Sequence, residues 1–190
     1  MKQKSRTEYS VMNTTVAFLA QTLAIFMGFF TRVVFTRTLS EGYVGINGLF
    51  TDILNILSLS ELGVGTAITY ALYAPIARRD IKKQQILMRM FRNFYRITAG
   101  FVLLAGLCLI PFLDILMKDR PDVNHLIIIY LLYLLNSVVS YLLIYKKTLV
   151  DAHQMNYITV MYHNGFLVLQ DILQIIVLFL TRNFILFLVI

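Results

Sequence analysis

VNHLIIIYLLYLLNSVVSYLLIY, residues 123–145, has no Lys, Arg, Asp or Glu and is long enough for a helix that crosses the hydrocarbon core of a bilayer. Four more largely apolar stretches of at least this length lie at about residues 13–36, 43–72, 95–117 and 157–180. A soluble domain of 190 residues, 58% of them hydrophobic and 14% charged, has too small a core to bury so much apolar surface. The sequence therefore predicts an all-α, polytopic transmembrane helix bundle with five full spans.

Helices are expected in place of strands, because a backbone exposed to lipid has to satisfy its own hydrogen bonds and these runs do not alternate as barrel strands do. After Arg182 and Asn183 the sequence is apolar again over residues 184–190, which is too short for a span. We expect this stretch to begin a sixth span, so that the chain is the N-terminal part of a larger transporter-like protein. A short hydrophobic tail packed on the bundle is the alternative.

The distribution of basic residues predicts the orientation. Twelve of the seventeen Lys and Arg residues lie in the N-terminal tail, in the loop between the second and third spans, and in the loop after the fourth span. These alternate segments should share the cytoplasmic side, because loops on that side carry an excess of basic residues. The N terminus is therefore predicted to be cytoplasmic. The net charge of +7 is not expected to bind nucleic acid, since the charges are divided among loops and do not form one face.

The loop between the second and third spans contains a further helical pattern. Pro75 is expected to end the second helix, and Asp80 is expected to cap a new one. Over about residues 80–94, apolar and basic residues then recur with helical spacing. The pattern predicts a basic amphipathic helix on the inner membrane face, with a partner-docking site as the alternative. Tyrosines near span ends, such as Tyr73 and Tyr95, are expected to be interfacial anchors.

Polar residues at membrane depth mark candidate functional positions, because they are costly there. The second span carries a stripe of small and polar residues that the helical repeat places on one side: Asn47, Thr51, Asn55, Ser58, Glu61, Gly65 and Thr69. Asp52 lies beside this stripe. Small polar residues alone are typical of helix–helix packing. Two carboxylates on one helix favour a water-lined cavity instead.

Arg32 and Asp171 are the other charged candidates. Arg32, in the outer third of the first span, is expected at the depth of Asp52 and either pairs with it or snorkels to the outer interface. A guanidinium that faces a cavity suits an anionic substrate, because its planar fork matches phosphate. Asp171, near the middle of the fifth span, is expected either to couple transport to protons or sodium or to form an interhelical hydrogen bond.

Sequence signals for enzyme chemistry are absent. The chain has no phosphate-binding glycine loop, no cluster with metal-ligand spacing and no nucleophile elbow. We therefore predict that it is not an enzyme and uses no cofactor or metal. A membrane glycosyltransferase or polymerase is the alternative from a different class, and it would be expected to show a sizeable outer loop with catalytic residues.

The region from Arg32 to Asp80 resembles the N-terminal hairpin of bacterial polysaccharide flippases, which export O-antigen or capsule repeat units. These flippases belong to the multidrug/oligosaccharidyl-lipid/polysaccharide exporter superfamily. The resemblance rests on Arg32 and Arg37, on Gly48-Leu49-Phe50, and on a group of motifs further along the same region: Leu57-Ser58-Leu59, Glu61-Leu62-Gly63-Val64-Gly65, Leu72-Tyr73 and Pro75-Ile76-Ala77. Ser40 departs from the pattern, since the family often has glycine in this turn.

This resemblance implies the N-terminal lobe of a two-lobe exporter. Such a protein flips undecaprenyl-diphosphate-linked oligosaccharide repeat units across the bacterial inner membrane by alternating access, for surface polysaccharide synthesis. The implied partners are this substrate, membrane lipid, a coupling proton or sodium ion, and polysaccharide polymerase and glycosyltransferases. The cavity residues predicted from the polar pattern are Arg32, Asn47, Thr51, Asp52, Asn55, Ser58 and Glu61. Of these, the resemblance implies Arg32 as the diphosphate contact and leaves a structural role as the alternative for Glu61. A peptidoglycan-precursor flippase or an ion-coupled drug exporter of the same fold is the alternative.

Overall fold

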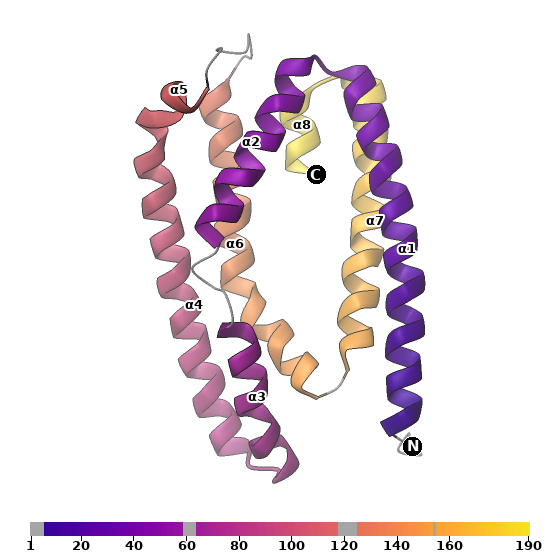
Figure 1. Cartoon of the computed structure of the whole chain (residues 1–190), viewed down its shortest axis with the longest axis vertical. Helices are drawn as coiled ribbons and strands as arrows, with labels where there is room; N and C mark the ends of the chain where they lie inside the picture. Colours follow the sequence, from indigo (N-terminus) through magenta and orange to yellow (C-terminus); the bar gives the residue numbers. More distant parts are fainter. Residues whose placement is uncertain (1–5, 59–63, 118–124, 154) are drawn as a thin grey trace.

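The computed structural model describes residues 6–58, 64–117, 125–153 and 155–190, and every regular element in these ranges is a helix (Figure 1). The helices in chain order are α1 (Arg6–Thr38), α2 (Glu41–Ser58), α3 (Val64–Ala77), α4 (Ile81–Leu109), η2 (Ile110–Phe112), α5 (Leu113–Leu116), α6 (Leu126–Ala152), α7 (Asn156–Thr181) and α8 (Phe184–Val189). The all-α prediction is therefore confirmed.

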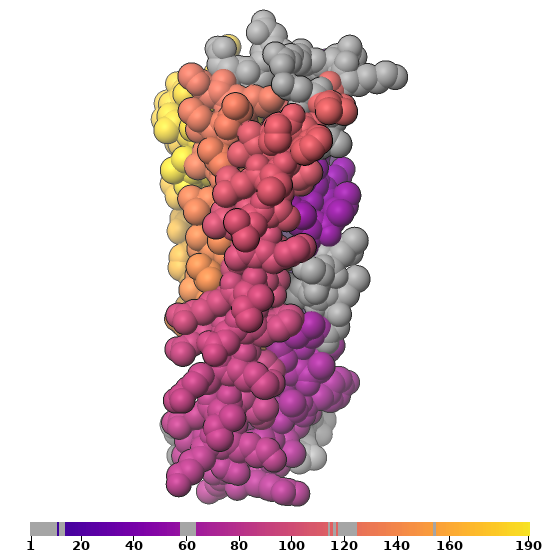
Figure 2. Space-filling view, turned by 90° about the vertical axis from the view of Figure 1, so that its left-hand side faces the viewer, coloured from indigo at the N-terminus to yellow at the C-terminus, as the bar shows by residue number. Residues whose placement is uncertain are grey.

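Four helices in the described part of the chain are long and apolar enough to cross a membrane: Thr14–Thr38, Ile81–Phe112, Leu126–Ala152 and Asn156–Thr181. Their outward sides are apolar. Helix α4, which runs the full height of the face in Figure 2, exposes a row of large apolar side chains at helical spacing: Ile86, Met90, Ile97, Phe101 and Leu104. Contiguous apolar surface of this kind is unfavourable in water and suits lipid. The helices thus suggest a membrane protein, and their arrangement is compatible with a membrane bundle.

The predicted second span, residues 43–72, is occupied by two helices. In Figure 1, α2 and α3 follow one another in the same direction alongside α4 and α6, and residues 59–63 between them lie outside the described residues. Helix α3 has 14 residues, which is too few for a span. Helix α2 is not among the four long apolar helices, because its polar stripe lowers its mean hydropathy. The prediction of five spans is therefore not confirmed at this position.

The junction of α3 and α4 confirms one prediction and corrects another. The Asp80 carboxylate caps α4 by accepting a hydrogen bond from the backbone N–H of Lys83 at 3.0 Å. Pro75, however, lies inside α3, which continues to Ala77, so the prediction that Pro75 ends this helix was wrong. A proline removes its own N–H donor and crowds the carbonyl four residues before it, and here the helix ends two residues after Pro75. The chain instead turns after Ala77, where Arg79 has a φ of 54° and the Asp80 N–H donates to the Pro75 carbonyl at 2.9 Å.

Residues 80–94 do not form a separate helix, because α4 runs without a break from Ile81 to Leu109. The side of α4 that was expected to rest on the membrane surface faces the bundle. Gln84 Nε2 donates a hydrogen bond to the Pro75 carbonyl at 3.2 Å, and Phe91 and Tyr95 are buried. This side is therefore part of the packing of α4 within the bundle, where α3 is one of its neighbours.

The helices form two groups. Helices α2, α3, α4 and α6 pack around a core that includes Phe50, Tyr130 and Leu134, whereas α1 lies along α7 (Figure 1). The groups approach each other where α1 passes into α2, and α8 lies between them there.

Four rings fill this junction, and we call them the aromatic cluster: Phe35, Tyr43, Phe184 and Phe187. The Phe35 ring lies 5.6 Å from that of Phe184 and 5.1 Å from that of Phe187, and the Tyr43 ring lies 5.0 Å from that of Phe184. The cluster therefore joins the end of α1, the start of α2 and α8.

Helices α4 and α6 make a close contact at Gly106. A Cβ atom added to Gly106 would lie 2.4 Å from Cδ1 of Leu134, and the Tyr130 hydroxyl donates to the Gly106 carbonyl at 2.8 Å. Small residues allow membrane helices to approach in this way, and a hydrogen bond across the contact adds to it.

Replacing Gly106 with valine should destabilise the protein by about 1–3 kcal/mol, because the buried Leu134 has little room to move aside. Thermal unfolding of the purified protein in detergent measures the effect. The matched control is Gly100→Val, in the same helix at a position where an added Cβ meets no atom within 4 Å. Equal melting temperatures for the two variants would contradict this account of the contact.

Candidate functional site

Three polar side chains from three helices lie near the aromatic cluster, and we call them the polar cluster: Arg32 of α1, Asn47 of α2 and Tyr133 of α6. The Tyr133 hydroxyl donates a hydrogen bond to Oδ1 of Asn47. The Arg32 guanidinium lies over the Phe35 ring, with Cζ 5.5 Å from the ring centroid, and is close enough for its charge to act on the Tyr133 hydroxyl. Two of the predicted cavity residues, Arg32 and Asn47, are thus brought to one place.

Apolar packing fixes these polar groups. Phe50 is fully buried, and its ring contacts Tyr130 and Tyr133 with centroid distances of 5.1 and 5.8 Å. Asn47 precedes Phe50 by one turn of α2, so the packed Tyr133 ring carries its hydroxyl to the Asn47 amide. Arg32 precedes the buried Phe35 by one turn of α1 and is exposed. Its charge therefore lies at the edge of the apolar junction.

The chemistry of the polar cluster suits an anion. Because Asn47 Oδ1 accepts from Tyr133, the NH2 group of the same amide is left as a donor. The guanidinium adds a planar set of N–H donors, which bind phosphate or carboxylate oxygens through charge-assisted hydrogen bonds. The aromatic ring beneath Arg32 holds the cation in place without neutralising it. Donors from both helix groups therefore converge on one small region.

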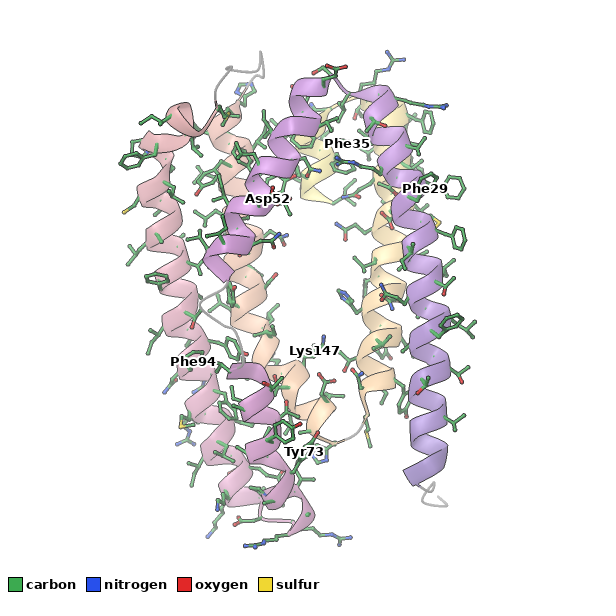
Figure 3. All side chains as sticks on the ribbon, viewed as in Figure 1. Phe29, Phe35, Asp52, Tyr73, Phe94 and Lys147 are labelled. Atoms are coloured by element: carbon green, nitrogen blue, oxygen red, sulfur yellow. The ribbon has the colours of Figure 1, made fainter. Side chains whose placement is uncertain are left out.

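The expected Arg32–Asp52 pair is not formed. Both residues belong to the described part of the chain, and Arg32 lies over Phe35 and near Tyr133 instead. Asp52 is exposed on α2, and Figure 3 shows it farther along that helix than the aromatic junction marked by Phe35. Helical spacing predicts which residues share a side of one helix. It does not predict how α1 lies against α2, and the predicted pair depended on that.

The remaining predicted cavity residues are Thr51, Asn55, Ser58 and Glu61. Thr51 is exposed and its hydroxyl donates to the carbonyl of Asn47 at 2.7 Å. Asn55 is exposed on the same helix. Ser58 is the last residue of α2, the placement of its side chain is outside the description, and Glu61 lies outside the described residues. Their predicted cavity roles therefore remain predictions.

Asp171 lies half-buried in α7 and has no hydrogen-bond or ion-pair partner among the described residues. Its neighbour on the next turn, Gln174, donates from Nε2 to the carbonyl of Phe187 in α8 at 3.1 Å. In this part of α7 an interhelical hydrogen bond is therefore made by Gln174 and not by Asp171. Coupling to protons or sodium through Asp171 remains a prediction.

A cavity of about 380 Å³, which we call the tyrosine pocket, lies between α3, α4 and α6. Its chemically distinctive lining residues are Thr69, Tyr70, Tyr73, Tyr95, Lys147 and Asp151. Tyr95 is 1% exposed, so it is a wall of this pocket and not the interfacial anchor that the sequence suggested. The sequence shows Lys147 and Asp151 one turn apart and Tyr70 and Tyr73 three residues apart. Their approach to one another depends on the packing of α3 against α6, which the sequence does not show.

Among the described residues, no group of three or more His, Cys, Asp or Glu could hold a metal ion. The sequence matches no family model, and no curated protein or solved structure matches it. The resemblance to polysaccharide flippases therefore remains a prediction, and the function is argued from the geometry of the polar cluster.

The Tyr133–Asn47 hydrogen bond should contribute about 0.5–1.5 kcal/mol to stability. A double-mutant cycle with Tyr133→Phe and Asn47→Ala, followed by thermal unfolding in detergent, measures this coupling. Tyr162→Phe, at an exposed position of α7, combined with Asn47→Ala is the control and should be additive. Additive effects for Tyr133→Phe and Asn47→Ala would show that the bond adds nothing.

Proposed function

We propose that the chain is the N-terminal lobe of a two-lobe exporter that flips undecaprenyl-diphosphate-linked oligosaccharide repeat units across the bacterial inner membrane for surface polysaccharide synthesis. The observation that carries this proposal is the polar cluster, where the exposed Arg32 guanidinium lies near the hydrogen-bonded pair of Tyr133 and Asn47 among long apolar helices. A diphosphate supplies the oxygens that the Arg32 guanidinium and the Asn47 NH2 group bind, and the lipid tail stays in the bilayer.

The energetic argument rests on the charge of Arg32. An arginine at the centre of a membrane helix costs about 2.5–3.5 kcal/mol on insertion scales, and less toward a helix end such as the position of Arg32. No acidic residue forms a salt bridge with Arg32 among the described residues. A ring face compensates only part of such a cost. An anionic headgroup that bound Arg32 together with Asn47 would offset the rest and would bridge the two helix groups.

The division of the polar cluster between the two helix groups supports transport by alternating access. Arg32 belongs to the group of α1 and α7, whereas Asn47 and Tyr133 belong to the other group. Movement of one group against the other separates or joins the two halves of the anion site, as in transporters whose lobes rock around a fixed site. In this proposal Asp171 and Asp52 are the groups that couple movement to protons or sodium, and polymerase and glycosyltransferases act on the same substrate.

Replacing Arg32 with alanine should abolish export, because the diphosphate loses its charged partner. The test places the gene that encodes this chain, at its natural length, in a bacterial strain without its own flippase. Surface polysaccharide and the lipid-linked precursor left inside are measured at matched membrane abundance. Arg32→Lys should retain part of the export, since it keeps the charge without the planar fork.

Arg37→Ala is the matched control, since Arg37 is exposed in the last turn of the same helix. It should export as the natural sequence does. Equal export by Arg32→Ala and the natural sequence would reject Arg32 as the diphosphate contact. Failure of the natural sequence to restore polysaccharide would favour a peptidoglycan precursor or a drug as substrate, and the corresponding precursor and drug-efflux assays decide between them.

The proposed orientation places the α3–α4 turn in the cytoplasm and the α1–α2 turn outside. These 190 residues contain one cysteine, Cys108, so Cys108→Ser, together with replacement of any cysteine outside them, gives a cysteine-free background. In that background, a membrane-impermeant maleimide added to intact cells should label the Ser40→Cys variant but not the Lys83→Cys variant. In permeabilised cells it should label both variants. The reverse pattern in intact cells would overturn the orientation.

A further inference from the structure

The tyrosine pocket is a second site, separate from the polar cluster. Figure 3 shows Tyr73 and Lys147 in the half of the molecule away from Phe35, with Lys147 extending from α6 toward the space between the two helix groups. The pocket volume of about 380 Å³ is at the small end of the range of about 300–1,000 Å³ for small-molecule sites. It is therefore large enough for a ligand of one or two rings.

Aromatic rings form one side of the pocket. Tyr70 is 73% exposed and Tyr73 is 42% exposed, and their rings meet edge to face with centroids 5.7 Å apart. The Tyr95 hydroxyl lies deeper, 3.5 Å from the position of a Cβ added to Gly65. Exposed ring faces beside phenolic hydroxyls can stack on the C–H face of a ligand while the hydroxyls bond its polar edge.

Charged groups form the opposite side, and they balance each other. Lys147 and Asp151 lie one turn apart on α6, and the Lys147 charge acts on the Asp151 carboxylate. Asp151 Oδ1 also accepts a hydrogen bond from the Thr159 hydroxyl of α7 at 3.3 Å. The pair thus presents both donors and acceptors to the pocket with no net charge.

We propose that the tyrosine pocket binds a neutral saccharide of one or two pyranose rings through stacking on Tyr70 and Tyr73 and hydrogen bonds to Lys147 and Asp151. A sugar ring offers an apolar C–H face and an edge of hydroxyls, which is the combination that the two sides of the pocket match. This proposal deepens the proposed function and rests on it for the choice of a saccharide among polar ligands. With the proposed orientation, the pocket lies in the cytoplasmic half, where the sugar part of the substrate would enter.

The balance of charge distinguishes a sugar from a cation. An aromatic cage for a cation would need a net negative or neutral wall without a competing ammonium group. Here Lys147 lines the pocket, and its charge acts on Asp151, the only acidic residue in the described lining. A bound cation would lie close to that ammonium group, whereas a hydroxyl can accept from Lys147 and donate to Asp151 at once.

Saturation-transfer NMR on the purified full-length protein tests the proposal. The probes are maltose and the methyl glycosides of glucose, galactose and N-acetylglucosamine, and the detergent is a zwitterionic one, because sugar-headed detergents would compete. Tyr70→Leu and Lys147→Met are expected to weaken binding at least about tenfold, since each removes one side of the site. Both residues are exposed, so their replacement leaves the core intact.

The matched controls are Tyr162→Leu, an exposed tyrosine of α7, and Lys146→Met, the exposed neighbour of Lys147. Both should bind as the natural sequence does. The proposal is overturned if no probe binds, if the control variants lose as much affinity as the pocket variants, or if tetraphenylphosphonium displaces the sugar from the pocket. Sugar binding without export by the natural sequence would reject the flippase function alone, and export without sugar binding would reject the pocket alone.

Discussion

The contact of Phe35 with Phe184 and Phe187 is the interaction on which the arrangement of the two helix groups depends. These rings join the end of α1 to α8, and Tyr43 extends the contact to the start of α2. Aromatic pairs of this geometry contribute about 0.5–1.5 kcal/mol each beyond the area they bury. Elsewhere the group of α1 and α7 has few contacts with the group of α2, α3, α4 and α6. The apolar junction therefore links the groups at one end, and the approach of α6 to α7, with the Thr159–Asp151 hydrogen bond, links them at the other.

The polar cluster exists because of this apolar link. Arg32 reaches Tyr133 only if α1 approaches α6, and Phe35, one turn further along α1, is the residue that holds α1 at the junction. Phe50 fixes Tyr133 in the same way from the other side. The charged Arg32 and the hydrogen-bonded pair of Tyr133 and Asn47 are thus positioned by buried rings and not by an ion pair. This explains how a cation can be held in place while its hydrogen-bonding atoms stay available.

The sequence predicted best what depends on local composition. The spans corresponding to α1, α6 and α7 agree closely with the helices, because length and hydropathy are properties of each segment alone. The contacts between segments were predicted less well. Pro75 was tolerated within α3 because the chain could turn two residues later, and residues 80–94 joined α4 because α3 offered a surface for their apolar side. Tyr133 was missed because an uncharged tyrosine in an apolar run carries no sign of its partner on another helix.

The close contact at Gly106 has a mechanical consequence. A missing side chain on α4, filled by Leu134 of α6, together with the Tyr130 hydrogen bond to the Gly106 carbonyl, allows these two helices a single register. Sliding of one past the other would bring Leu134 against a bulkier position and break that bond. The two helices therefore form one rigid unit, so the rocking proposed for transport would require changes where the two helix groups join, at the aromatic junction and where α6 approaches α7.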